Sequence, residues 1–215
     1  MLIFTDCSFQ KKGVVMEKKV SKKKTKKDAD KKPDVYVSID GEFTGRIPGR
    51  GSMISFGAVA YALNGTELTR FKVNMKELRG SKRDKDVMRW WRKFPKAWRA
   101  ATKNPIKPRK AMKLFAAWLK LLPGNPKLLG WPLPVDFQFI YWYYWRFVGE
   151  MPPFGFDGMD VKSYVAGRMN IPLSEVSQTK LKKLLRVRLH GLQHDPLCDA
   201  DEQGRLFFAI ANYKP

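Results

Sequence analysis

The chain has 215 residues, and its 44% hydrophobic content, with 7 Trp and 14 Phe, is enough for the core of one ordinary domain. A net charge of +22 predicts a polyanionic partner, nucleic acid first and an anionic membrane surface second. No apolar run reaches the about 20 residues of a membrane-spanning helix. Two cysteines are too few for a disulfide framework or a cysteine-based zinc site, so a reducing compartment fits.

Residues 1–33 hold 11 Lys against 4 acidic residues, with few apolar residues after Met16. We predict a disordered basic arm here and a folded domain over residues 34–215. The lysine-rich run 22–27 is a nuclear address, a non-specific nucleic-acid contact or a solubilising tail. The apolar run at the start is too short for a signal-peptide core, so we do not expect secretion. We expect a cytoplasmic protein, or a nuclear one if the lysine-rich run is a nuclear address.

Residues 35–43 alternate between apolar and polar side chains and predict a strand that ends in two acids. Side chains two residues apart on a strand share one face, so Asp40 and Glu42 point the same way. Neighbouring carboxylates repel each other, and a divalent cation allows both to stay ionised. The Asp-x-Glu pattern is common, and a solvated turn is the alternative unless further ligands follow.

The next segments predict a hairpin meander. The glycine-rich segment 45–51 lacks the Lys-Ser/Thr ending of a P-loop, so we expect a basic hairpin loop. Residues 53–61 and 68–75 have the composition of strands, and Asn64-Gly65 between them is a strong turn signal. Three consecutive antiparallel strands are therefore expected.

Residues 84–120 have a helical apolar period with a proline-rich break at 105–108. We expect the tryptophans of this segment in the core, with a base-stacking platform among the interleaved Arg and Lys as the alternative. Residues 127–131 predict a short strand. The aromatic segment 136–147 predicts a buried helix that has Pro134 in its first turn.

Two more acids and a histidine are candidates for the same site. Asp136, at the start of the aromatic helix, is either a helix-dipole charge or a ligand. Asp199 lies on the inward side of a C-terminal helix, and His194 lies in the loop that enters this helix. The other histidine, His190, has no partner motif and is expected to be structural.

In chain order, Asp40-x-Glu42, Asp136 and His194-x4-Asp199 resemble the DEDDh group of 3′–5′ exonucleases, which share a ribonuclease-H-like fold. The resemblance covers residues 34–213. It implies an α/β domain with a mixed five-stranded sheet, whose first three strands are antiparallel, and helices on both faces.

The sequence departs from the family pattern at one point. The histidine-asparagine pair that often precedes the second-motif acid is replaced by residues 131–134, Trp-Pro-Leu-Pro. Asp157 and Asp160 are therefore rivals to Asp136, although Asp160 follows a short strand and is better suited to capping a helix.

The resemblance implies metal-dependent hydrolysis of phosphodiester bonds from the 3′ end of single-stranded RNA or DNA, which releases nucleoside 5′-monophosphates. Asp40, Glu42, Asp136 and Asp199 would hold two Mg²⁺ or Mn²⁺ ions roughly 4 Å apart. His194 would act as the general base. The substrate contacts would include Phe43, Thr44 and Phe137. A nucleic-acid-binding or scaffold protein that keeps the nuclease fold is the alternative function, against which the intact set of site residues argues.

Overall fold

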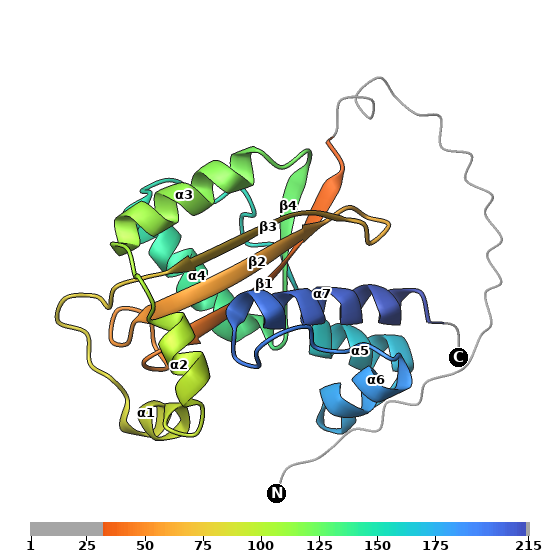
Figure 1. Ribbon diagram of the computed structural model, residues 1–215. Coiled ribbons are helices and arrows are strands. Elements are labelled where there is room, and N and C mark those ends of the chain that lie inside the picture. Colours follow the sequence, from red (N-terminus) through yellow and green to blue (C-terminus); the bar gives the residue numbers. More distant parts are fainter. Residues whose placement is uncertain (1–31, 214–215) are drawn as a thin grey trace, which may run out of the picture. The chain divides into compact units, whose positions relative to one another are not determined.

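The structure is a computed structural model that describes residues 32–213 (Figure 1). Its centre is a five-stranded sheet with the order β3-β2-β1-β4-β5. The strands are β1 (Asp34–Phe43), β2 (Met53–Tyr61), β3 (Glu67–Asn74), β4 (Asn125–Gly130) and β5 (Gly158–Asp160). The pairs β1–β2 and β2–β3 are antiparallel, whereas β1–β4 and β4–β5 are parallel. The predicted mixed sheet is confirmed, and residues 1–31 of the predicted arm lie outside the described residues.

The helices of the described part are α1 (Lys85–Trp91), α2 (Pro95–Ala101), α3 (Pro108–Lys120), α4 (Leu133–Phe147), α5 (Val161–Met169), α6 (Gln178–Leu184) and α7 (Pro196–Ala211), with a 3-10 turn η2 (Leu173–Glu175). The predicted single break in residues 84–120 was incomplete, because a second break separates α1 from α2 at residues 92–94. Pro95 explains it, since proline is tolerated only in the first turn of a helix.

Between residues 32 and 213, no helix is both long enough and apolar enough to cross a membrane.

Helices cover both faces of the sheet, as the sequence predicted (Figure 1). The alternating side chains of β1 divide between them. Val37 and Ile39 belong to the cluster that contains α3 and α4, whereas Tyr36 packs on Phe207 and Phe208 of α7. Because side chains two apart share a face, the even-numbered Asp40 and Glu42 lie on the α7 side.

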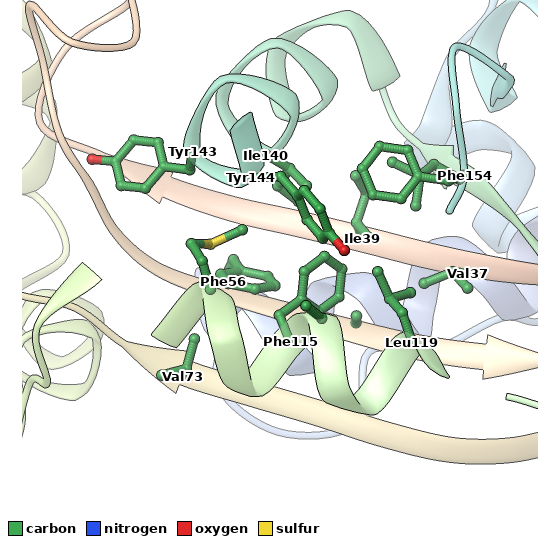
Figure 2. Packing of buried hydrophobic residues seen from close by; sticks show 14 of the residues in the cluster. Val37, Ile39, Phe56, Val73, Phe115, Leu119, Ile140, Tyr143, Tyr144 and Phe154 are labelled. Atoms are coloured by element: carbon green, nitrogen blue, oxygen red, sulfur yellow. The ribbon is translucent and has the colours of Figure 1, made fainter. Parts of the chain in front are cut away.

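The larger core cluster fixes α4 against the sheet. Figure 2 shows Phe115 and Leu119 of α3 and Ile140 and Tyr144 of α4 converging over the strands. Fully burying a side chain of this size stabilises the fold by about 1.5–3 kcal/mol. The hydroxyl of Tyr143, also in α4, accepts a hydrogen bond of 2.8 Å from the backbone N–H of Met53 in β2. This packing determines where the first turn of α4, which carries an acid of the candidate site, meets β1.

Two glycines allow α7 to lie directly on the sheet. A Cβ atom at Gly57 of β2 would lie 2.4 Å from the backbone nitrogen of Leu197, and one at Gly204 of α7 would lie 2.4 Å from the ring of Tyr61. Real Cβ contacts essentially never fall below 3.0 Å. The missing side chains therefore let the N-terminal end of α7, where Asp199 lies, sit against β2 next to the acids of β1.

We expect Gly57→Ala to lower the free energy of unfolding by about 1–3 kcal/mol, because the new methyl group is forced into the α7 backbone. Chemical denaturation followed by circular dichroism measures this change. Gly167→Ala is the matched control: nothing lies within 4 Å of its new methyl group in α5. This control should gain about 0.5–1 kcal/mol from helix propensity. Equal stabilities of Gly57→Ala and the wild type would contradict the close approach.

Candidate active site

The carboxyl-terminal end of β1 supplies two acids. Strand β1 pairs with β4 only as far as Ser38, so its last residues extend past that neighbour. Asp40 Oδ1 accepts a hydrogen bond of 2.8 Å from Gln203 Nε2 of α7. The other end of this amide, Gln203 Oε1, accepts one of 2.9 Å from the backbone N–H of Trp131. Gln203 thus connects β1 to the β4–α4 turn and orients the Asp40 carboxylate, while Glu42 is buried.

Asp136 reaches β1 from the first turn of α4. Its Oδ1 accepts a hydrogen bond of 2.8 Å from the backbone N–H of Gly41, and only 5% of the residue is exposed. A Cβ atom at Gly41 would lie 3.1 Å from that oxygen and 2.5 Å from the ring of Phe43. Glycine between the two strand acids therefore leaves the space that Asp136 occupies.

The two rivals of Asp136 have other contacts. Asp160 is the N-cap of α5: it accepts a hydrogen bond of 2.7 Å from the backbone N–H of Ser163, and its other oxygen accepts one of 2.9 Å from that of Leu133. Asp157 is exposed and forms an ion pair with Lys127. The capping role expected for Asp160 is confirmed.

The loop before α7 brings His194 to Asp199. Asp195 caps α7 by accepting hydrogen bonds from the backbone N–H groups of Leu197 and Cys198. His194 has a left-handed φ of 60° and donates its backbone N–H to Asp199 Oδ2 over 2.9 Å. The candidate ligand atoms of Glu42, His194 and Asp199 all lie within 4.8 Å of one another. Residues from β1 and from the α7 loop thus meet at one point.

Aromatic rings from the α1–α2 region hold the imidazole of His194. The ring centroid of Trp90 lies 4.6 Å from that of His194, and the centroid of Phe94 lies 4.3 Å from it, both edge to face. Sequence reasoning missed this contact. The sequence feature that could have indicated this contact is the mixture of Trp and basic residues in 84–120. The expectation that these tryptophans lie in the core holds for Trp91 but not for Trp90, which is 36% exposed.

These side chains border a cleft with a volume of about 470 Å³. Its lining comprises Asp40, Gly41, Glu42, Phe43, Gly45, Arg46, Val87, Trp90, Val135, Gln138, His194 and Asp199. The lining is acidic at Asp40, Glu42 and Asp199 and apolar at Phe43, Val87, Trp90 and Val135, and it contains the guanidinium of Arg46. A polar hollow of about 440 Å³ shares Asp40, His194 and Asp199 with this cleft. Asp40 and Asp199 therefore border both open spaces.

Two of the three expected substrate contacts are not in the cleft. Thr44 is completely buried, and its hydroxyl accepts a hydrogen bond of 3.0 Å from the backbone N–H of Ser52. The ring of Phe137 packs against Tyr141 and Phe154 instead. Neither residue lines the cleft, because residue spacing does not show which way a side chain turns after a strand ends. Phe43 does line the cleft.

Burial and mutual repulsion make the four acids hard to ionise. Burial raises the pKa of Asp136 to about 8 and that of Asp199 to about 6. The pKa values of Asp40 and Glu42 are raised well above their usual range, first by burial and then by the neighbouring carboxylates. Burial lowers the pKa of His194, which favours the neutral imidazole that a base requires.

The residues fit divalent cations. Although the chain carries a net charge of +22, no Lys or Arg among residues 32–213 forms an ion pair with Asp40, Glu42, Asp136 or Asp199. Glu42 and Asp136 are buried and Asp40 and Asp199 are partly buried. Ionised carboxylates in such positions without a cationic partner are costly, and metal ions would remove this cost. Hard oxygen donors suit Mg²⁺ or Mn²⁺.

Comparisons with known proteins agree with this geometry. No protein-family model matches the chain. In sequence, the chain is similar to the 3′-5′ DNA exonuclease Cap18 of Escherichia coli. The two are 27% identical over 188 residues, which cover 82% of this chain and 91% of Cap18.

Solved structures share the fold at low sequence identity. The nuclease domain of 3′hExo, a DEDDh family member bound to rAMP, has a TM-score of 0.65 and 15% identity, covering 83% of this chain and 92% of that one. The Mg²⁺- and Mn²⁺-bound form of S. pombe Pop2p has a TM-score of 0.63 and 16% identity, covering 83% of both chains. The chain is thus similar in sequence to a 3′-5′ DNA exonuclease and in fold to a DEDDh nuclease, so the resemblance found in the sequence is confirmed.

The raised pKa of Asp136 predicts a pH dependence of stability in the metal-free protein. Because its pKa rises from 3.8 to about 8 on folding, the folded state retains a proton that the unfolded state releases. The stability that this retained proton contributes is fully present below pH 3.8 and is lost as the pH rises through about 8. We expect the Tm to fall over this pH range. Asp136→Asn should make the fall smaller, because the amide does not ionise and its oxygen can still accept the hydrogen bond from the backbone N–H of Gly41.

Thermal unfolding at several pH values, with EDTA present, measures this slope. Asp157→Asn is the control, because Asp157 is exposed and should leave the slope as in the wild type. Identical slopes for the wild type and Asp136→Asn would show that Asp136 holds no extra proton. Adding Mn²⁺ should raise the Tm most at the higher pH, where binding displaces the fewest protons.

Proposed function

We propose that the protein is a metal-dependent 3′–5′ exonuclease that acts on single-stranded nucleic acid and releases nucleoside 5′-monophosphates. The observation that carries the proposal is the meeting of Glu42, His194 and Asp199 within 4.8 Å, beside Asp40 and Asp136, in a cleft with one apolar wall. The relative Cap18 is a 3′-5′ DNA exonuclease, which supports DNA as the first substrate to test.

The cleft suits a terminal nucleotide. Its apolar wall comes from Phe43, Val87, Trp90 and Val135, which offer contacts to a base and a sugar. The ring of Phe43 is stacked on Phe139, with centroids 4.1 Å apart and an interplanar angle of 28°. Because Phe139 is fully buried, this stack holds Phe43 in place. The acids of the same lining would face the phosphate of this nucleotide.

Asp40, Glu42, Asp136 and Asp199 would hold two Mg²⁺ or Mn²⁺ ions. Such ions lower the pKa of an attacking water and stabilise the charge on the leaving 3′ oxygen. Gln203 keeps the Asp40 carboxylate oriented, and the backbone of Gly41 does the same for Asp136. The imidazole of His194, whose pKa is lowered by burial, would accept the proton of the water. Trp90 and Phe94 restrict the motion of this ring.

Strands labelled at the 3′ or the 5′ end, made of DNA or of RNA and either single-stranded or paired, test the proposal in Mg²⁺ and then in EDTA. A 3′ label should be released first as a mononucleotide, while a 5′ label should produce a ladder that shortens with time. Release should stop in EDTA. Binding without any metal-dependent release would instead indicate the scaffold alternative.

The ligand assignment predicts the effect of single substitutions. Asp40→Ala, Glu42→Ala and Asp199→Ala should each lower turnover by on the order of 10³-fold or more, since each removes a carboxylate that would bind metal at the scissile phosphate. Circular dichroism should show intact folding, because each change removes a buried, repelled acid. Asp157→Ala, at an exposed acid, should keep wild-type turnover. A metal-saturated variant with near-wild-type activity would remove that residue from the ligand set.

A substitution at His194 distinguishes an active exonuclease from a protein of the same fold that only binds metal. As a general base it is needed for proton transfer, so His194→Ala should lose on the order of 10²–10⁴ in turnover. Affinity for Mn²⁺ and for a DNA strand should stay close to wild type. His190→Ala, which changes an exposed histidine, is the control and should keep its rate. Equal rates for both variants would exclude His194 as the base.

A further inference from the structure

The cleft at the acids continues into a second hollow that none of the four acids lines. This hollow has a volume of about 390 Å³, and Gly45 and Arg46 line both spaces. We call it the basic pocket; its lining comprises Gly45, Arg46, Ile47, Arg50, Gly51, Lys82, Arg83, Asp84 and Lys85. It forms where the glycine-rich loop after β1 meets the segment that leads into α1.

The basic pocket carries an excess of positive charge. Five of its side chains are cationic, and Asp84 is its one acid. Arg46 lies 3.5 Å from Asp84, and Arg83 forms an ion pair of 2.6 Å with Glu77. The other three cations, Arg50, Lys82 and Lys85, are exposed and form no ion pair within residues 32–213. Like charges gathered in one hollow repel each other, and a bound anion relieves this repulsion.

Backbone contacts hold the two sides of the pocket together. The N–H of Lys82 donates to the carbonyl oxygen of Arg50 over 2.8 Å, and the N–H of Asp84 donates to that of Thr44 over 2.7 Å. A Cβ atom at Gly51 would lie 2.7 Å from the Cα of Gly45, so the loop closes on itself only with glycine there. The pocket is therefore a built feature of the fold and not a chance approach of long side chains.

We propose that the basic pocket binds a second phosphate group of the nucleic acid whose terminal nucleotide occupies the cleft. This inference rests on the proposed function. A nucleic acid strand carries one phosphate per nucleotide, and the acids with their metal ions would bind only the scissile one. Arg50, Lys82 and Lys85 can neutralise a neighbouring phosphate and release its counterions. That phosphate belongs either to the strand backbone or to a phosphorylated 3′ end.

The test compares two triple variants that lose the same charge. Arg50→Gln/Lys82→Gln/Lys85→Gln alters the basic pocket. Lys107→Gln/Lys110→Gln/Lys113→Gln alters another basic hollow, at α3, and is the control. Fluorescence anisotropy, with Ca²⁺ in place of Mg²⁺, measures the affinity for three DNA probes: a dinucleotide with a 3′ hydroxyl, the same dinucleotide with a 3′ phosphate, and a strand of about 12 nucleotides.

For a probe that reaches the pocket, the affinity of the pocket variant should be about tenfold lower than that of the control variant. The slope of log affinity against log salt concentration should also become shallower by about 0.7 for each lost phosphate contact. A loss confined to the long strand assigns the pocket to the backbone, and a loss confined to the 3′-phosphorylated dinucleotide assigns it to that end. Equal affinities of the two triple variants, or an equal loss for all three probes, would overturn the proposal. Because binding is measured without turnover, a failure of hydrolysis would reject the proposed function separately.

Discussion

Repulsion among four carboxylates, two of them buried and two partly buried, is the constraint on which this structure depends. No single segment can hold them, since Asp40 and Glu42 come from β1, Asp136 from α4 and Asp199 from α7. The two core clusters, one on each face of the sheet, supply the free energy that keeps these elements together against the repulsion. A bound cation would relieve this electrostatic cost.

Close packing at two strand glycines fixes how near the acid-bearing helices lie to the sheet. Gly41 leaves room for Asp136, and Gly57 leaves room for the start of α7. Each glycine lies on the strand face from which an acid-bearing helix approaches. A methyl group at either position would separate the acids by pushing a helix outward, so the same positions govern both the stability of the fold and the assembly of the site.

The charges of the domain divide into an acidic centre and a basic surround. Phosphate would be repelled by the four acids alone, so both a cation at the centre and basic side chains near it are needed for a nucleic acid to approach. Arg46 lies at the junction of the cleft and the basic pocket. His194 lies beside the carboxylates of Glu42 and Asp199, and the rings of Trp90 and Phe94 pack on its imidazole, whose pKa is lowered by burial.

The sequence by itself determined the features that depend on local rules. A period of two put Asp40 and Glu42 on one face, Asn64-Gly65 predicted the β2–β3 hairpin, and a capping role was expected for Asp160. Only the tertiary structure decided which distant segments meet: that Thr44 turns inward to Ser52, that Trp90 contacts His194, and that Arg50 lies beside Lys82. Periodicity reports the face on which a side chain lies, but the neighbour on that face is selected by the packing of the whole core.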